Sequence, residues 1–225
     1  EFAKIGVILY LSHILNKKYR NIYRIKAILL PAFIFLLLIT FLIFLQPDFS
    51  TVIVLWVIIF IILYIGGVRF FHIISLGITW IIFTALYFFM ESYRIERLFS
   101  FLNRSGEQGA SNFQINQSLI ALGSGHITGV GLGNSMQKYS YLPEANTDFI
   151  FAIIGEELGF LGALTIMLLF FILFWRGFKT SLMAPDAFGS LLAAGVTAMI
   201  MVQALMNIGV VTGAIPVTGI NLPFI

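Results

Sequence analysis

The feature that most constrains this chain is Ala27–Leu45, a run of nineteen residues without one charged side chain. An α-helix needs about 20 consecutive apolar residues to cross the hydrocarbon core of a bilayer. Uncharged stretches also occupy Thr51–Gly67, Ile73–Met90 and Ala187–Val211. Phe149–Trp175 is a further apolar stretch, broken by the acidic pair Glu156 and Glu157, and a shorter one covers Phe2–Leu15. The pattern predicts an all-α polytopic membrane protein with about six transmembrane helices.

Composition supports this class, since 60% of residues are hydrophobic and only 10% are charged. Soluble domains contain about 25% charged residues, so a soluble fold, a disordered chain and a nucleic-acid-binding surface are excluded. The chain has no cysteine, which excludes disulfides, thiolate metal sites and cysteine nucleophiles. The three histidines are far apart in the sequence, which argues against a zinc site.

The basic residues indicate the orientation. Asn16–Lys26 carries five lysines and arginines and no acid, which is typical of a cytoplasmic loop. Alternation then places Gln46–Ser50 and Glu91–Thr147 outside, and Val68–His72 and Arg176–Asp186 inside.

Glu91–Thr147 is a long loop of 57 residues, and loops of that length are usually functional. It includes an amphipathic stretch, Phe113–Leu122, and the glycines between Gly123 and Gly133. We interpret it as an ordered extracellular cap, with a disordered loop as the alternative. The glycine spacing is not a nucleotide fingerprint, but exposed backbone N–H groups there would suit a pyrophosphate. Positive charge on the same side comes from Arg94, Arg97, Arg104 and Lys138, unless these only face solvent or headgroups.

The strongest local signal is Tyr141-Leu-Pro-Glu-Ala-Asn-Thr-Asp148, which runs directly into the fifth apolar stretch. Asn146 or Thr147 is expected to cap that helix, which leaves Asp148 at its N-terminus near the outer membrane surface. The helix dipole favours the ionised carboxylate, and a low dielectric raises its pKa. A carboxylate under these opposing influences is a candidate general base. The alternative is a plain N-terminal helix anchor.

Glu156 and Glu157 follow eight and nine residues later. On an unbroken helix they would lie roughly 12–14 Å deeper, where charges are costly and must face a cavity, pair with a base or be protonated. Gly155 and Gly159 form a G-x-x-x-G step that permits close helix contact. The alternative for the glutamates is a buried structural network. Asp48 is expected to cap the helix that begins near Thr51.

Several motifs, in order, resemble the SEDS family of shape, elongation, division and sporulation proteins (FtsW, RodA and SpoVE). They are Glu1-Phe-Ala-Lys4, Gln46-Pro-Asp48-Phe, Gln117–Gly125, Gly131-Leu-Gly-Asn-Ser-Met-Gln-Lys138, the Tyr141–Gly159 segment and the Asn207–Ile225 tail. The sequences of the Gly131–Lys138 and Tyr141–Gly159 motifs are more similar to the FtsW/SpoVE branch than to RodA. Asn146, His126, Ser50 and Asn221 depart from the family pattern, in which His, Gly, Gly and Pro are usual. The resemblance implies one SEDS-type transmembrane domain over 1–225, an incomplete part of a protein with about ten spans.

The resemblance also implies a peptidoglycan glycosyltransferase of the bacterial cell membrane that polymerises lipid II on its extracytoplasmic face. Asp148 would be the general base, with Lys138, and then Lys4, near the pyrophosphate. Glu144 would position the loop or the substrate, and Glu156 and Glu157 would organise the cavity.

No motif requires a cofactor, although a divalent cation, Mg²⁺ or Mn²⁺, would help to neutralise the pyrophosphate. The implied partners are a class B penicillin-binding protein and other division proteins. Two alternatives stay open: a flippase that carries lipid II across the membrane, and a non-catalytic scaffold that activates a transpeptidase.

Overall fold

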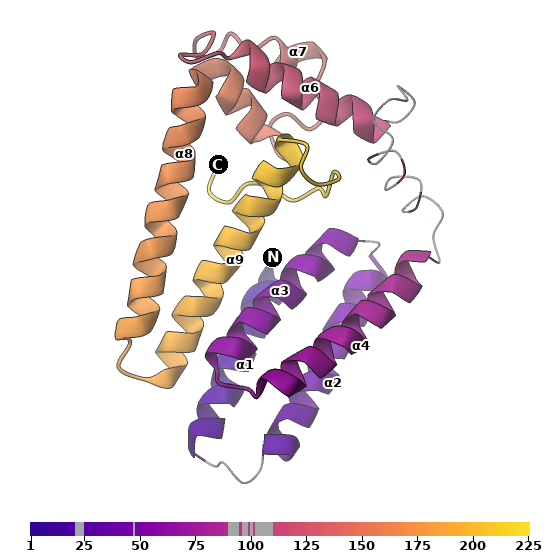
Figure 1. The fold of residues 1–225 in the computed structure, drawn as a ribbon, viewed down its shortest axis with the longest axis vertical. Helices are drawn as coiled ribbons and strands as arrows, with labels where there is room; N and C mark the ends of the chain where they lie inside the picture. Colours follow the sequence, from indigo (N-terminus) through magenta and orange to yellow (C-terminus); the bar gives the residue numbers. More distant parts are fainter. Residues whose placement is uncertain (21–24, 47, 90–94, 96–98, 100, 102–109) are drawn as a thin grey trace. The chain divides into compact units, whose positions relative to one another are not determined.

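In the computed structural model, the described residues are 1–20, 25–46, 48–89, 95, 99, 101 and 110–225. Within these ranges the regular structure is entirely helical (Figure 1). The helices are α1 Phe2–Arg20, α2 Ile25–Phe44, α3 Phe49–Ile65, α4 Phe70–Phe89, α6 Ala110–Ser124, α7 Gln137–Ser140, α8 Ile150–Met183 and α9 Ala187–Val211.

The all-α membrane class is confirmed. Three of the described helices, α4, α8 and α9, are long and apolar enough to cross a membrane. Shorter apolar helical stretches are Phe33–Phe44, which is part of α2, and α3. The count of six spans is therefore not confirmed. The bounds predicted for the last apolar stretch, Ala187–Val211, are those of α9.

Two helices run on into predicted inner loops. α1 continues past Leu15 to Arg20, and α8 continues past Trp175 to Met183. The predicted loop Arg176–Asp186 is therefore mostly helix. Its lysine and arginine are good helix formers, and the first strong helix breaker is Pro185, just beyond the end of α8.

The chain divides into two compact units, and α4, α8 and α9 contribute to both. The first unit contains Glu1–Gly77 and Phe171–Val202. In it α1, α2 and α3 pack together, and the indole Nε1 of the buried Trp56 donates to Thr40 Oγ1 at 3.0 Å. Gly195 of α9 lies so close to Ile8 and Ile62 that a Cβ there would be 2.6 and 2.9 Å from their side chains.

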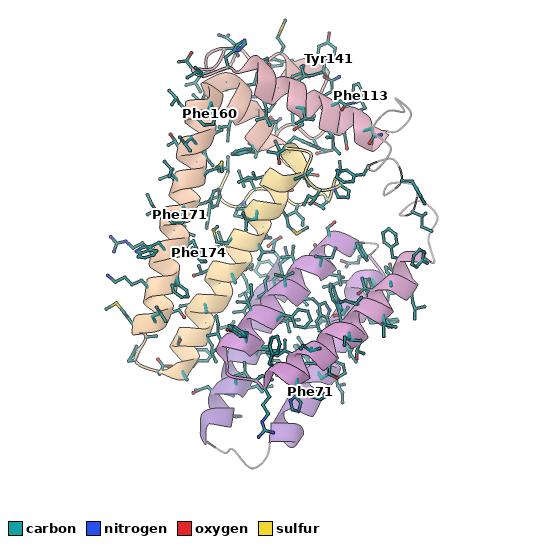
Figure 2. The ribbon with its side chains drawn as sticks, in the orientation of Figure 1. Phe71, Phe113, Tyr141, Phe160, Phe171 and Phe174 are labelled. Carbon is teal, nitrogen blue, oxygen red and sulfur yellow. The ribbon has the colours of Figure 1, made fainter. Side chains whose placement is uncertain are left out.

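The second unit contains Ile78–Phe170 and Gln203–Ile225. It holds α6, α7, the first part of α8 and the C-terminal segment after α9. The predicted amphipathic helix Phe113–Leu122 is confirmed as part of α6. Large apolar side chains are exposed along the whole of α8, in this unit at Phe160 and in the first unit at Phe171 and Phe174 (Figure 2). Exposed apolar side chains on a long apolar helix fit a surface that faces lipid.

Candidate active site

The site is organised around a break inside α8. Gly159 has φ 68° and ψ −166°, a backbone region that only glycine occupies readily. The break separates a short first segment, Ile150–Leu158, from a long second one, Phe160–Met183. The two run in clearly different directions in Figure 1.

A helix break leaves carbonyl groups unpaired on one side and N–H groups unpaired on the other. Here the loop that follows α6 satisfies both sets. Val130 N donates to Glu156 O and Gly131 N to Glu157 O, both at 3.0 Å. In return, the carbonyls of His126 and Ile127 accept from Phe160 N at 2.9 Å and from Leu161 N at 3.2 Å. The loop and the two halves of α8 therefore form one hydrogen-bonded unit.

Glycines allow this close approach. A Cβ on Gly129 would overlap the carbonyl of Glu157, and one on Gly125 would overlap the carbonyl of Gly155. The G-x-x-x-G step of α8 does permit close contact, but the partner at Gly159 is the backbone of Ile127 and Gly129, not a helix. The predicted close helix contact is therefore present at Gly155, where a Cβ would lie 2.5 Å from the Leu122 side chain of α6, and absent at Gly159.

The same contacts weaken the phosphate-binding interpretation of these glycines. The N–H groups of Gly125, His126, Gly129, Val130 and Gly131 all donate to backbone carbonyls within the second unit. They are not available to a phosphate oxygen. Tight packing against α8 explains Gly125 and Gly129, whereas a Cβ on Gly123 or Gly133 would meet nothing within 4 Å.

The break also changes where Glu156 and Glu157 lie. The predicted depth of roughly 12–14 Å required one straight helix through Gly159, and that requirement is not met. Both glutamates come before the long segment that begins at Phe160. Twenty residues of that segment, as far as Lys179, already span about 30 Å, the thickness of the hydrocarbon core. Glu156 and Glu157 therefore belong to the end of the span and not to its middle.

Glu156 is 2% exposed, and its carboxylate is held by the segment before α7. The Ser135 hydroxyl donates to Glu156 Oε2, and Met136 N donates to Oε1 at 3.1 Å. Ser135 Oγ also accepts from Lys138 N at 3.1 Å. The buried network that we considered for this glutamate is what the structure contains. Its effect is to fix the start of α7, which carries the exposed Lys138.

Glu157 is partly exposed, and its Oε1 is a buried oxygen without a hydrogen-bond partner in the structure. Buried carboxylate oxygens normally have partners. Both carboxylate oxygens of the neighbouring Glu156 accept hydrogen bonds. Glu157 differs, because its Oε1 can still accept one.

Asp148 lies in a tight turn just before α8. The turn is closed by Thr147 N and Phe149 N, which donate to Glu144 O at 3.2 and 3.3 Å. Glu144 has φ 54°, a left-handed conformation that is uncommon outside glycine. The Thr147 hydroxyl donates back to Glu144 Oε2 at 3.1 Å. The prediction that Asn146 or Thr147 caps α8 is therefore wrong, since α8 begins only at Ile150 and the Thr147 side chain is used within the turn.

This turn sets the acidity of Asp148. Burial raises the pKa of its carboxyl above the ordinary value, the nearby Glu144 charge raises it further, and a hydrogen bond from Thr147 opposes both. The first two effects disfavour the ionised form, and the third favours it. Asp148 is only half-buried, so its carboxyl is shielded but still reachable.

Sequence reasoning missed Asn207, a buried residue of α9. Its Nδ2 donates to Asp148 O at 2.7 Å and to Ile220 O at 2.8 Å. It ties the Asp148 turn to the C-terminal segment Gly213–Ile225. Asn207 opens the Asn-x-Gly tail motif, which was the available signal, but its partners are 59 and 13 residues away in the chain.

The remaining predicted residues are distributed as follows. Lys4 belongs to the first unit, where its buried ammonium pairs with Glu1 Oε1 at 2.7 Å. Asp48, also in the first unit, accepts from Thr51 N at 3.0 Å, which confirms it as the cap of α3. Lys138, Glu144, Asp148, Glu156 and Glu157 all belong to the second unit. Arg94, Arg97 and Arg104 lie outside the described residues. Within the described ranges, no three His, Cys, Asp or Glu side chains are grouped to hold a metal ion.

The chain is similar to known proteins along its whole length. The family model of the FtsW, RodA and SpoVE proteins, described as "Cell cycle protein", matches residues 1–225. Stage V sporulation protein E of Bacillus subtilis is 44% identical over the whole chain, which covers 62% of that relative. The probable peptidoglycan glycosyltransferase FtsW of Trichlorobacter lovleyi is 38% identical, again over the whole chain and over 59% of the relative. The chain thus spans about three fifths of the length of these relatives.

Two solved structures are similar in fold. One is a peptidoglycan synthase complex in which polymerization and crosslinking are structurally coordinated, with a TM-score of 0.74 and 26% identity. The other is the rod shape determining protein RodA of Thermus thermophilus, in a variant with one aspartate replaced by alanine, with a TM-score of 0.62 and 25% identity. Each match covers 98% of this chain, and the chain covers 61% and 56% of the two structures.

Proposed function

Because the chain belongs to the FtsW, RodA and SpoVE family of cell cycle proteins, we propose that its parent protein is a peptidoglycan glycosyltransferase that polymerises lipid II. Relatives at 37–40% identity are named probable peptidoglycan glycosyltransferases. The chain is part of a multi-pass membrane protein, which suits a reaction whose donor, acceptor and leaving group carry lipid tails.

The observation that carries the proposal is the environment of Asp148. It is a half-buried carboxyl, with its pKa raised by burial and by Glu144, in a turn that packing holds in place. A general base works best when its pKa approaches the working pH, and burial is the usual way to raise the pKa of a carboxyl.

The proposed step balances as follows. Asp148 takes the proton from the 4-hydroxyl of the acceptor GlcNAc as that oxygen attacks C1 of the donor MurNAc. The new glycosidic bond forms, the bond from C1 to the pyrophosphate oxygen breaks, and undecaprenyl pyrophosphate leaves with both electrons of that bond.

The leaving pyrophosphate needs positive charge nearby. Lys138 is the candidate in the second unit, because it is exposed and the bonds from Ser135 to Glu156 fix its helix. Lys4 is the second candidate, and a divalent cation, Mg²⁺ or Mn²⁺, would serve the same purpose. Glu144 shapes the Asp148 turn, and Glu157 keeps one buried acceptor for the substrate or for Lys138.

For localisation and partners, we propose the bacterial cell membrane with the Asp148 turn on the extracytoplasmic face, as the positive-inside rule indicates. A class B penicillin-binding protein is the proposed partner. The support is the structural neighbour, a complex that coordinates polymerization and crosslinking.

The flippase alternative depended on acids near the middle of a span and on broken helices. The break at Gly159 moves Glu156 and Glu157 to the end of the span, which removes the first ground, while the broken helix itself remains compatible with a carrier. A scaffold is separated from an enzyme by experiment.

The test is lipid II polymerisation by the full-length parent protein, purified with its transpeptidase partner, comparing wild type with Asp148→Asn. We expect glycan strands from the wild type and at least a 100-fold lower rate from the variant, since a general base contributes about 10²–10⁴-fold. Unchanged partner binding by the variant would separate lost chemistry from lost assembly. Equal polymer from both proteins would refute Asp148 as the base.

A further inference from the structure

Asn207 makes the contacts expected of a residue that controls another residue's position. Its side chain amide is 1% exposed. A side-chain amide carries two N–H bonds, and here both are used, one on Asp148 O and one on Ile220 O. The acceptor in the turn is the carbonyl of Asp148 itself, so Asn207 fixes the peptide group from which the carboxylate projects.

The second contact brings the C-terminal segment beside that carboxylate. A Cβ on Gly219, the residue before Ile220, would lie 3.7 Å from Asp148 Oδ2. Gly219 has φ +71°, which favours glycine, while the space beside Asp148 would admit a methyl group in ordinary van der Waals contact. The segment therefore forms a wall next to the acid and removes water from one side of it.

No ionisable side chain occurs in Gln203–Ile225 or in α6. The charged group that raises the pKa of Asp148 is Glu144, which lies in the same turn. The segment thus acts on the carboxyl by excluding water and not by adding charge, and burial is the largest cause of its raised pKa.

We infer that Asn207 is a positioning residue for the proposed reaction: its two N–H groups hold the Asp148 turn against the C-terminal segment, which keeps the carboxylate in one orientation beside Gly219. This inference depends on the proposed function for its catalytic meaning. Its structural content, that Asn207 controls the surroundings of the Asp148 carboxyl, does not depend on it.

The test uses the full-length parent protein with its transpeptidase partner and has two readouts. The first is the kinetics of lipid II polymerisation. The second is labelling of Asp148 by a water-soluble carbodiimide with an amine, located by mass spectrometry and followed against pH. Carbodiimide reacts with the protonated carboxyl, so the labelling midpoint reports the acidity of Asp148 whether or not the enzyme turns over.

For Asn207→Ala we expect kcat to fall about 10- to 100-fold, the range for a displaced catalytic group, with KM for lipid II within about twofold. The labelling midpoint should move to lower pH, because a loosened turn readmits water to the carboxyl. The matched control is Asn221→Ala, which removes an exposed amide from the same segment and should change neither readout.

Gly219→Ala is a second variant that leaves Asn207 in place. Its methyl group would sit beside Asp148 Oδ2 and exclude more water, so the labelling midpoint should move to higher pH. Opposite shifts in the two variants would support the inference. The inference would be overturned if Asn207→Ala lowered the activity by the same factor at every pH and left the labelling midpoint of Asp148 unchanged. A shifted midpoint in a protein whose wild type makes no polymer would overturn the proposed function alone.

Discussion

The substitution Gly159→Ala tests the broken helix most directly. The backbone at Gly159 lies in a region almost closed to other residues, which costs about 1–3 kcal/mol for a residue with a Cβ. The added methyl would also overlap Gly129 N and Ile127 O, so the loop must move away. Four hydrogen bonds between the loop and α8 depend on that contact, each with a net contribution of about 0.5–1.5 kcal/mol.

If half of those bonds weaken, the total loss is about 2–6 kcal/mol. For a chain of this size, 1 kcal/mol corresponds to about 2–4 °C in Tm. We therefore expect Tm to fall by about 5–20 °C. The assay is thermal unfolding of the purified full-length protein in detergent, followed by intrinsic tryptophan fluorescence.

The matched control is Gly123→Ala, inside α6. A Cβ there would meet nothing within 4 Å, and alanine in a helix is more stable than glycine by about 0.5–1 kcal/mol. The control should leave Tm unchanged or raise it slightly. If Gly159→Ala and Gly123→Ala have the same Tm, the break and its supporting loop do not stabilise the fold as argued.

Three further predictions follow from the same geometry. Glu156→Gln should lower Tm less than Glu156→Ala, because the amide oxygen still accepts one of the bonds from Ser135 and Met136, whereas alanine leaves both donors unpaired at about 1–3 kcal/mol each; equal Tm values would contradict this. His126→Gly should raise stability by about 0.5–1 kcal/mol, because His126 has φ 46° and glycine accepts that conformation without strain; a lower midpoint in denaturant would contradict it. Asp148 has a raised folded pKa, so its contribution to stability is present below its unfolded pKa and is lost as pH rises through its folded pKa. Asp148→Asn should therefore raise Tm near neutral pH, with the gain disappearing in acid, and a gain that persists in acid would refute the assignment.

Much of the fold follows from the sequence, because lipid imposes a simple rule on apolar runs. That rule gave the bounds of α9 and the approximate extent of α3 and α4. Asp48 was predicted as a helix cap from local chemistry alone, since capping needs only a carboxylate three residues before an N–H. These features depend on interactions within a few residues.

The break at Gly159 was not predicted, because its causes are not local. Gly155-Glu-Glu-Leu-Gly159 reads as a continuous helix with a small-residue face. The hydrogen bonds that stabilise the break come from Ile127, Val130 and their neighbours, about 30 residues earlier in the chain. The same holds for Asn207, because its two hydrogen-bond acceptors, Asp148 O and Ile220 O, are distant from it in the sequence. An acidic pair beside a glycine in an apolar run was the signal that a straight helix was the wrong expectation.

The order of the two partners along the chain has a consequence for biogenesis. The loop residues His126–Gly131 precede α8, so they are synthesised first and are already present when the first apolar segment of α8 leaves the ribosome. The loop carbonyls and N–H groups that bond to α8 on either side of the break are therefore made before the helix itself. A circularly permuted protein that made α8 before the loop would present Phe149–Trp175 to the insertion machinery as a single segment, interrupted by Glu156 and Glu157 but with no loop to pair with the backbone on either side of Gly159.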